Sequence, residues 1–469
     1  MSGTGTLTAA AAERQGASYY VPGVRVARLA RQLQSGSEPG TLLPKSVLGD
    51  LVRAEVTRVN TGVSQYSLTF NNWYLATAQD RAQHLDDLGD GAPREVVDGA
   101  TRAPYWPRFK YNDFSLLSFG DRLRVDMRYV PEPTGKPRSE QDDQASWTPM
   151  VSGPITDIRF SFASGQGAQL TVSGEDDLSA LKDKQDKRIP MDRRAELNIV
   201  RQALQKAHYP LKFAAPLVEY PAFATDDGQG IQEALNAGQS TLEFIQKLAD
   251  RLDFEVFVEF GSLVGTAAPL EFHFEPYRGR AKPNQSLRPV FRLDRERNLL
   301  DFTPTIKVVD QYSSVEVKGR HRDPLLAREV KGEASHTILA DELHRDSSLD
   351  AALKSGPEVR AHFFSARDNR FTVPNQANLD DVRADWSAKS VIRKKARELF
   401  AIEASTLGVP RLRPGSHVEI RGMRAPFDGF YYTTKTVHTF GADGYRTKIS
   451  AARPGMPLPP YAQASGGPR

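Results

Sequence analysis

Short runs in which apolar and polar residues alternate recur through the first and last thirds of the chain. In the first third, residues 52–56 alternate, a turn follows at residues 60–62, and residues 66–70 and 122–129 alternate again. Because successive side chains of a strand point to opposite faces, this pattern predicts strands with one buried face and one polar face. Short strands separated by turns favour an antiparallel sandwich or barrel over a parallel sheet.

Helical signals concentrate in the middle of the chain. Residues 193–207 form a helical window, and Ser240 with Glu243 fits the capping box that begins a helix. Residues 254–260 and 270–275 then alternate again, with aromatic residues at many of the apolar positions. This order predicts a mixed helix and β-hairpin domain whose aromatic side chains lie in the core.

Strands return in the last third around one long helix. Residues 386–407 are predicted to be helical, with Gly408 as the C-terminal stop and Pro410 preventing continuation. Residues 418–420 and 430–449 then alternate and turn as a second set of strands. The sequence therefore predicts a second β-rich region.

The fold class predicted from this order is α+β and β-dominated, with two small antiparallel β domains flanking a mixed α/β middle domain. The two ends of the chain are rich in small and turn-forming residues, which favour flexible segments. We divide the chain into a flexible N-terminal arm (residues 1–44), a first β domain (45–189) with an insertion (71–118), a middle domain (190–300), a second β domain with the long helix (301–453) and a flexible tail (454–469).

Composition excludes several classes of protein. The 469 residues include no Cys, which excludes disulfide scaffolds, thiolate zinc sites and cysteine nucleophiles. Lys and Arg number 62 against 58 Asp and Glu, and a net charge of +4 is too small to predict nucleic-acid binding. No apolar run reaches the roughly 18 residues of a membrane span, so no membrane insertion is predicted.

Motifs that carry chemistry are missing from the sequence. The nine histidines form no HExxH motif and no i, i+4 pair on a predicted helix, so no metal site is expected. No nucleophile elbow or phosphate loop is present, and no cofactor is expected. Three acidic pairs lie beside turn residues, where Asp caps the backbone: Asp86–Asp87, Asp176–Asp177 and Asp226–Asp227. We therefore expect no catalytic residues and no enzymatic activity.

Seven segments, in order over most of the chain, carry a resemblance to a known family. They are residues 151–158 (Val-Ser-Gly-Pro-Ile-Thr-Asp-Ile), 172–178, 240–259, 408–422 (beginning Gly-Val-Pro-Arg-Leu-Arg-Pro-Gly), 427–432, 436–440 and 444–447. Together these segments resemble the late control D proteins of contractile phages. That family comprises baseplate hub proteins and is similar to the N-terminal hub part of the VgrG spikes of type VI secretion.

The resemblance implies a structural protein without chemistry. Members of the family form homotrimers in which each chain contributes two related small β-barrel domains of the tube type. The resulting ring has pseudo-sixfold symmetry, so it can meet the hexameric inner tube protein on one side and the trimeric central spike protein on the other. The expected place of such a protein is a phage tail-like particle, a virion or an injection device, assembled in the bacterial cytoplasm.

Two features depart from compact members of the family. The insertion at residues 71–118 is longer than expected, and its aromatic residues Tyr105 and Trp106 are candidate interface residues toward other baseplate components. The alternative is that they pack on their own domain. No sequence for a spike follows Arg453, so we expect the spike tip to be a separate polypeptide, as in phage-like or extracellular contractile injection systems.

Two other functions stay open from the residues alone. The acidic pairs and the insertion are compatible with a baseplate-borne peptidoglycan hydrolase. The aromatic residues of the insertion are compatible with a carbohydrate- or receptor-binding module.

Overall fold

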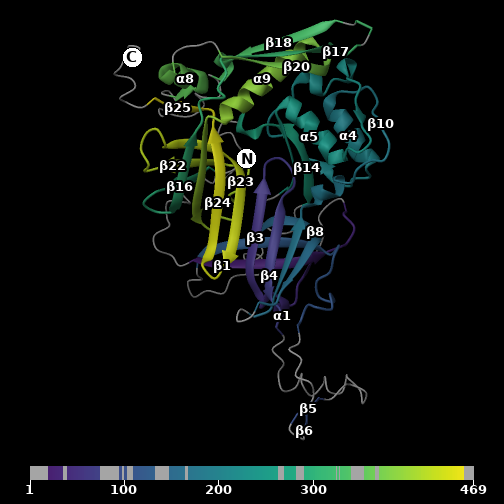
Figure 1. Ribbon diagram of the computed structural model, residues 1–469, viewed down its shortest axis with the longest axis vertical. Coiled ribbons are helices and arrows are strands. Elements are labelled where there is room, and N and C mark those ends of the chain that lie inside the picture. The colour runs from purple at the N-terminus through teal and green to yellow at the C-terminus, as the bar shows by residue number, and fades with distance from the viewer. Residues whose placement is uncertain are drawn as a thin grey trace, which may run out of the picture.

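A 13-stranded, largely antiparallel sheet runs through the computed structural model and joins the first and last thirds of the chain (Figure 1). Its main path follows the order β16-β21-β24-β23-β3-β4-β9-β8-β7-β1-β2, and β22 and β15 extend it from β23. The structure describes residues 20–34, 40–73, 95–97, 100–102, 109–131, 147–163, 167–261, 269–280, 290–323, 325–326, 328–339, 353–364 and 369–458.

The first β region confirms the strands predicted from alternation. It consists of β3 (Leu51–Val59), β4 (Gln65–Asn71), β7 (Arg122–Pro131), β8 (Thr148–Ser161) and β9 (Gln169–Glu175), with the short helix α1 (Lys45–Leu48) before them. The first half of β8 pairs with β7 and its second half pairs with β9. A strand that changes partners along its length turns a corner in a sheet, and this corner encloses a core that includes Val56, Leu68 and Val125.

Part of the predicted flexible N-terminal arm is a strand. Residues Tyr20–Leu29 form β1, which pairs with β7 from Tyr20↔Pro131 to Leu29↔Arg122, and β2 (Thr41–Leu42) pairs with β1. Val26 of β1 is fully buried in the core of the first region. The arm prediction is therefore wrong for these residues, because ten backbone positions pair with a strand about one hundred residues away, which local composition does not reveal.

The last β region consists of β15 (Phe291–Asp294), β16 (Leu299–Ile306), β21 (Phe400–Leu407), β22 (His417–Arg421), β23 (Gly429–Gly441) and β24 (Gly444–Arg453). The predicted helix 386–407 is correct only in its first part. Helix α9 spans Asp381–Arg397, and β21 follows it after a turn. Strand β21 pairs with β16 and β24 on its two sides, and Phe400, Ile402 and Ala404 are buried at every second position because one face of β21 packs on the core of this region.

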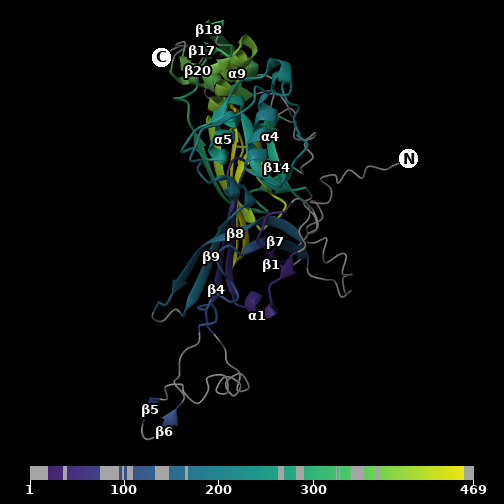
Figure 2. The same cartoon turned by 90° about the vertical axis from the view of Figure 1, so that its right-hand side faces the viewer.

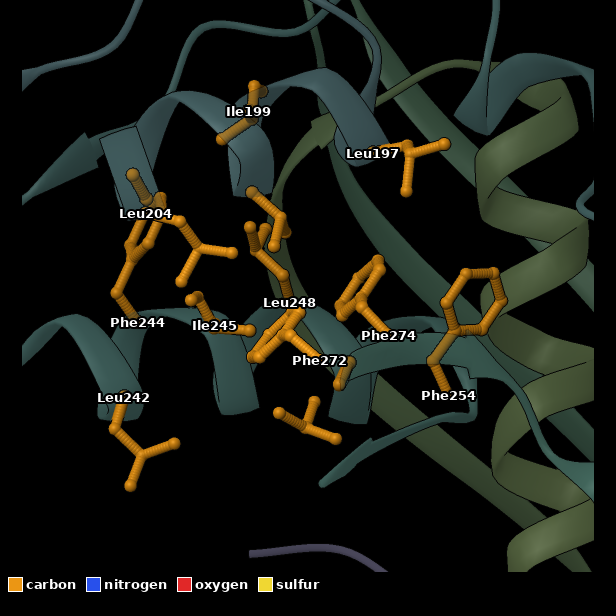
Figure 3. Packing of buried hydrophobic residues seen from close by; sticks show 14 of the residues in the cluster. Leu197, Ile199, Leu204, Leu242, Phe244, Ile245, Leu248, Phe254, Phe272 and Phe274 are labelled. Atoms are coloured by element: carbon orange, nitrogen blue, oxygen red, sulfur yellow. The ribbon is translucent and has the colours of Figure 1, made fainter. Parts of the chain in front are cut away.

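The middle region is a helix pair on a small sheet, as predicted. Helices α4 (Glu196–Lys206) and α5 (Thr241–Leu252) pack on β13 (Phe254–Phe260), β14 (Leu270–Pro276) and β11 (Lys212–Phe213) (Figure 3). The capping box is confirmed, because Ser240 Oγ accepts the N–H of Glu243 at 3.1 Å and Glu243 Oε2 accepts the N–H of Ser240 at 2.9 Å. The apolar faces of both helices meet Phe272 and Phe274 between them and the strands (Figure 3).

A second α/β layer lies between β16 and β21 in the sequence. Strands β17 (Ser314–His321), β18 (Glu329–Ser335) and β20 (Arg370–Leu379) form a three-stranded sheet that α9 covers. This layer packs against the middle region near the top of Figure 1. Arg383 of α9 makes two hydrogen bonds to Glu196 of α4, at 2.6 and 2.9 Å, and Trp386 Nε1 donates to Leu252 O at 2.9 Å.

The remaining elements are short. They are β5 (Glu95–Val97), β6 (Ala100–Arg102), β10 (Ile189–Pro190), β12 (Ala234–Leu235), β19 (Leu353–Ser355), α8 (Gly356–Phe364), β25 (Gly455–Pro457) and five 3-10 turns. Strand β25 pairs with β19, so the start of the predicted tail is ordered. Seen from the side, β5 and β6 lie far from the α/β layers, beyond the end of the large sheet (Figure 2).

The α+β, β-dominated class is confirmed. Within the described strands the large sheet does not close on itself, so the two predicted barrels are not confirmed. The domain boundaries stay a prediction. None of the helices in the described ranges has the length and apolarity needed to cross a membrane.

Candidate assembly interface

The same arrangement of five strands occurs twice in the large sheet. Unit 1 consists of β3, β4, β7, β8 and β9, and unit 2 consists of β16, β21, β22, β23 and β24. In both, the first strand pairs with the second, the second with the fifth, the fifth with the fourth and the fourth with the third. Every one of these pairings is antiparallel, so the two units share one topology.

The two units also share their irregularities. The fourth strand of each shifts register at a threonine, Thr156 in β8 and Thr434 in β23. The hydroxyl groups donate to equivalent carbonyl oxygens, Ser173 O at 3.5 Å and Ser450 O at 3.1 Å. The first strand of each unit shifts register after its first residue, next to Val52 and Leu300. Bulges at matching positions fix a residue-by-residue equivalence between the units.

Glycines at matching turns extend this equivalence. Gly120 and Gly415 precede the third strand with φ of 76° and 83°, and their N–H groups donate to Ile155 O and Thr433 O. Gly167, two residues before β9, and Gly444, the first residue of β24, have φ of 74° and 88°. A positive φ favours glycine over other residues, so the shared backbone geometry accounts for a glycine at all four positions although the surrounding side chains differ.

The units differ in what they insert between strands. Unit 1 carries residues 72–121 between its second and third strands, where unit 2 has residues 408–416. Unit 2 carries residues 307–399 between its first and second strands, where unit 1 has residues 60–64. The second insertion supplies the layer of β17, β18, β20 and α9.

The two units join through one strand pair. The second half of β23 in unit 2 pairs with β3 in unit 1, from Lys435↔Val59 to Phe440↔Ala54. At this internal joint, Phe440 and Tyr445 of unit 2 pack against the core of unit 1. The side chains of Val56 and His438, which face each other across the pair, are both fully buried. Unit 2 therefore completes the core of unit 1.

A buried ionic cluster braces the internal joint. Glu259 of β13 accepts hydrogen bonds from Arg58 (3.2 Å), Arg278 (3.2 Å) and Arg413 (3.1 Å). Arg58 belongs to unit 1, and Arg413 lies just before β22 in unit 2 and also donates to Pro149 O of β8 at 2.6 Å. The cluster consequently ties both units to the middle region.

Two further carboxylates balance the charge of the cluster. Glu275 accepts from Arg278 Nε at 2.7 Å, and Glu255 accepts from the Tyr432 hydroxyl at 2.7 Å and from Asn60 Nδ2 at 2.6 Å. Burial raises the pKa of Glu255 to about 7, against the opposing field of Arg278. Burial lowers the pKa of Arg58, and Glu259 counteracts this shift. Buried charges are tolerated when they are paired and hydrogen-bonded, as these are.

Two strand segments correspond to the two strands of the internal joint, but each has an outer edge with which no strand of the described ranges pairs. They are the second half of β8, equivalent to β23, and β16, equivalent to β3. We call these two edges the open edges. Phe162, which continues β8, is 54% exposed, and Ile306 of β16 is 40% exposed, whereas their equivalents Phe440 and Arg58 are half-buried and buried. The open edges thus expose apolar side chains that the internal joint covers.

Aromatic side chains surround the open edge of β8. Phe162 lies edge-on to Phe109, with ring centroids 4.8 Å apart, and Phe109 lies 6.0 Å from Trp73. Phe114 lies 5.8 Å from Phe160. Trp73 and Phe114 are themselves 44% and 40% exposed. An exposed apolar patch of this kind marks an interaction surface more often than isolated apolar residues do.

The face of the sheet opposite the two cores is polar. It carries Ser and Thr side chains together with charges in pairs, such as Lys448–Glu403 at 2.8 Å and Arg53–Glu55 at 2.8 Å. A shallow hollow of about 200 Å³ opens on it, partly lined by Glu55 and Glu175.

Several of the predicted site residues lie outside the part of the chain that the structure describes. Tyr105 and Trp106, and the acidic pair Asp86–Asp87, lie outside the described residues. In the described part of the chain, no group of three or more His, Asp or Glu side chains is arranged to hold a metal ion. The interface prediction for Tyr105 and Trp106 stays a prediction.

The two described acidic pairs serve the backbone and its neighbours. Asp176 accepts the N–H groups of Ser64 (2.7 Å) and Leu178 (3.1 Å), and burial raises its pKa to about 7. Asp177 accepts two hydrogen bonds from Arg122, at 3.1 and 2.9 Å. In the other pair, Asp226 caps the N–H of Gly228 and Asp227 caps that of Ala195, as expected for Asp beside turns.

Sequence reasoning missed the open edges and the ionic cluster. Ile158, Phe160 and Phe162 alternate as a strand in the sequence, but alternation does not tell whether a neighbouring strand covers them. Glu255 and Glu259 occupy the polar positions of an alternating strand and would be solvent-exposed if β13 had only one covered face.

Two solved structures with the same fold are tail proteins, one of them from a prophage. The 43 kDa tail protein of prophage MuSo2 from Shewanella oneidensis aligns over 92% of this chain and 99% of its own, with a TM-score of 0.55 and 10% identity. A tail protein from Neisseria meningitidis MC58 aligns over 92% of this chain and 96% of its own, with a TM-score of 0.50 and 12% identity. No protein-family model and no curated protein matches the sequence. The resemblance to phage tail proteins is confirmed at the level of the fold.

Proposed function

We propose that this chain is the structural baseplate hub of a contractile injection system or phage tail. Three copies form a ring that joins a hexameric inner tube to a trimeric central spike. The observation that carries the proposal is the duplicated unit, with one joint made within the chain and the equivalent edges left open. The fold shared with two solved tail proteins, one of them from a prophage, supports it.

Ring closure follows from the kind of contact at the internal joint. The fourth strand of one unit meets the first strand of another, so the contact uses two different surfaces and leaves one of each open. Contacts of this heterologous kind either propagate as a filament or close into a ring. If each step between units turns by one sixth of a circle, three copies of two units close a ring of six. Such a ring presents six similar β units to the tube and three identical chains to the spike.

The polar face of the sheet is the better lining for the lumen of this ring. Both cores, the layers around β1 and β7, and the helices all cover the other face. Covering layers need more room than a bare sheet, and the outer circumference of a ring provides it. The paired charges and hydroxyl groups of the polar face would then contact whatever passes through.

The insertion supplies a second contact in this proposal. Tyr105 and Trp106 would anchor another baseplate component, because large aromatic side chains dominate the energy of protein interfaces. A Trp106→Ala variant that keeps its oligomeric state should then bind that component more weakly in a pull-down assay with purified baseplate proteins. Binding equal to that of the unchanged protein would leave the insertion without this role.

The role proposed is non-catalytic. The described acidic pairs bind backbone N–H groups and Arg122, which supports structural work in preference to acid–base catalysis. The proposed place of assembly is the bacterial cytoplasm, within a phage tail-like particle.

Mass and shape in solution test the hub directly. Light scattering on the purified chain should give three times the chain mass of 52.0 kDa, alone or once the spike protein is added. Negative-stain images should show a ring with threefold symmetry. A chain that stays monomeric at all concentrations and binds neither a tube protein nor a spike protein would refute the proposal.

A further inference from the structure

We infer that the open edge of β16 pairs, antiparallel, with the open edge of β8 in a second copy of this chain. The inference rests on the proposed ring and names the surfaces and the register by which it closes. The register is taken from the internal joint, because both open edges have residue-by-residue equivalents there.

The equivalence fixes which residues face each other. The shared bulges place Thr156 at the position of Thr434, and Leu300 at that of Val52. The internal pairs run from Lys435↔Val59 to Phe440↔Ala54. Transferred to the open edges, the pairs between copies are Asp157–Lys307, Ile158–Ile306, Arg159–Thr305, Phe160–Pro304, Ser161–Thr303 and Phe162–Phe302.

The side chains of the two edges match in this register. On the core face every pair is apolar against apolar: Ile158–Ile306, Phe160–Pro304 and Phe162–Phe302. On the polar face Asp157 lies opposite Lys307, which pairs opposite charges. Cross-strand pairs of these kinds stabilise a sheet. A slip by one residue would place every apolar side chain against a polar one.

Exposure gives independent support. Of the three core-face positions of β16, Phe302 and Pro304 are half-buried and Ile306 is exposed, whereas their equivalents in β3, Ala54, Val56 and Arg58, are all buried. The difference is what a missing neighbouring strand would produce. A second copy placed as at the internal joint covers these positions, and Phe162 enters the core of unit 2 as Phe440 enters that of unit 1.

Pro304 limits which strands can pair with this edge. Proline has no N–H, so the ladder between copies lacks at most one hydrogen bond at this position, and proline is tolerated at sheet edges. Proline at an edge also discourages indiscriminate strand pairing. An edge that carries Pro304 together with exposed Leu300 and Ile306 therefore favours a partner whose side chains match it.

Engineered disulfides test the pairing and its register. The chain has no Cys, so a double variant with Arg159→Cys and Thr305→Cys holds the only two thiols, both at exposed positions. The N–H of Asn60 donates to Thr434 O across the internal joint, so Val59 and Thr57 belong to the narrow pairs that do not exchange hydrogen bonds. Thr305 is equivalent to Thr57, and Cα atoms about 4.5 Å apart in such pairs suit a disulfide.

Oxidation of the trimer should link most of the R159C/T305C chains into covalent dimers and trimers on a denaturing gel. The matched control R159C/T303C moves one cysteine by two residues on the same face and should link at least fivefold less. A second variant, Phe162→Asp, should weaken the trimer at least tenfold in light-scattering dilution series, whereas Phe162→Leu should leave it close to unchanged.

The outcomes separate the two proposals. A trimer that forms but links in neither double variant overturns the strand pairing and leaves the hub standing. Stronger linking of R159C/T303C overturns the register. Disulfide-linked dimers of a single Thr305→Cys variant would mean that two β16 edges meet, which overturns the pairing of β16 with β8. The absence of any trimer with or without spike protein overturns the hub itself.

Discussion

Replacing Glu259 by glutamine removes the carboxylate on which three buried arginines converge. Arg58, Arg278 and Arg413 each lie within 3.2 Å of a Glu259 oxygen, and Glu259 is 5% exposed. The amide of glutamine keeps one acceptor oxygen but turns donor N–H groups toward cations. The cluster then holds three positive charges against Glu275 and Glu255, and Glu255, with a pKa of about 7, is only partly ionised near neutral pH.

The expected cost follows from burial. Removing one partner of a buried ion pair costs about 3–5 kcal/mol, because the remaining charge is left uncompensated out of water. A loss of this size is a large part of the roughly 5–15 kcal/mol that stabilises a folded protein. At roughly 2 °C per kcal/mol for a large chain, we expect the melting temperature of E259Q to fall by about 6–10 °C.

Circular dichroism during heating and urea titration measure the loss. The matched control is Glu403→Gln, which breaks the Lys448–Glu403 pair at 2.8 Å, where both side chains are 58% exposed. A surface pair of this kind contributes about 0–1 kcal/mol, so the control should melt within about 2 °C of the unchanged protein. Equal melting temperatures for the two variants would refute the reasoning.

Charge balance provides a second check on the same cluster. Adding Arg413→Gln to E259Q removes one positive charge and should recover part of the loss, although Arg413→Gln alone is destabilising. Such a non-additive cycle is expected for residues that are in contact or belong to one ion-pair network. Strict additivity of the two changes would mean that the cost of E259Q arises from something other than the buried charges.

Three further predictions concern pH, packing and capping. Glu255 has a pKa of about 7 in the folded chain against 4.5 ordinarily, so its contribution to stability is full below pH 4.5 and is lost as the pH rises to 7. In urea titrations at pH 5 and pH 7.5, E255Q should remove up to about 3 kcal/mol of the fall in unfolding free energy between the two pH values. The same fall in E255Q as in the unchanged protein would contradict this assignment. A Cβ at Gly153 would lie 1.8 Å from Glu175 O, so Gly153→Ala should lower the free energy of unfolding by more than about 3 kcal/mol or abolish folding. The control Gly441→Ala should fold, because its Cβ meets nothing closer than 3.8 Å. Ser240→Ala removes the cap of α5 and should cost about 1 kcal/mol in urea unfolding, and no loss would mean that solvent replaces the cap.

Much of the local structure could be predicted from the sequence. Alternation located β3, β4 and β7, and the capping box located the start of α5 at Ser240. These signals lie within a few residues of the element that they describe. The helix prediction failed beyond Arg397, because Phe400 to Leu407 carries both helical and alternating spacing and only pairing with β16 and β24 decides between them.

The candidate interface could be predicted only in outline. The family resemblance implied two related β domains, but it did not indicate which strand edges they use. Deciding that Phe162 is exposed while Phe440 is covered requires knowing which strand lies beside each of them. The two phenylalanines have similar surroundings in the sequence, so their different exposure cannot be read from it.

The sequence by itself determined which segments become strands or helices and which faces are apolar, because periodicity and capping act between near neighbours. Only the tertiary structure decided that the first and last thirds share one sheet and that three arginines meet Glu259 beneath the joint. Thr439 and Glu55, which meet across that joint, are separated by 384 positions. Contacts at such distances depend on the packing of all the intervening chain, and no local pattern records them.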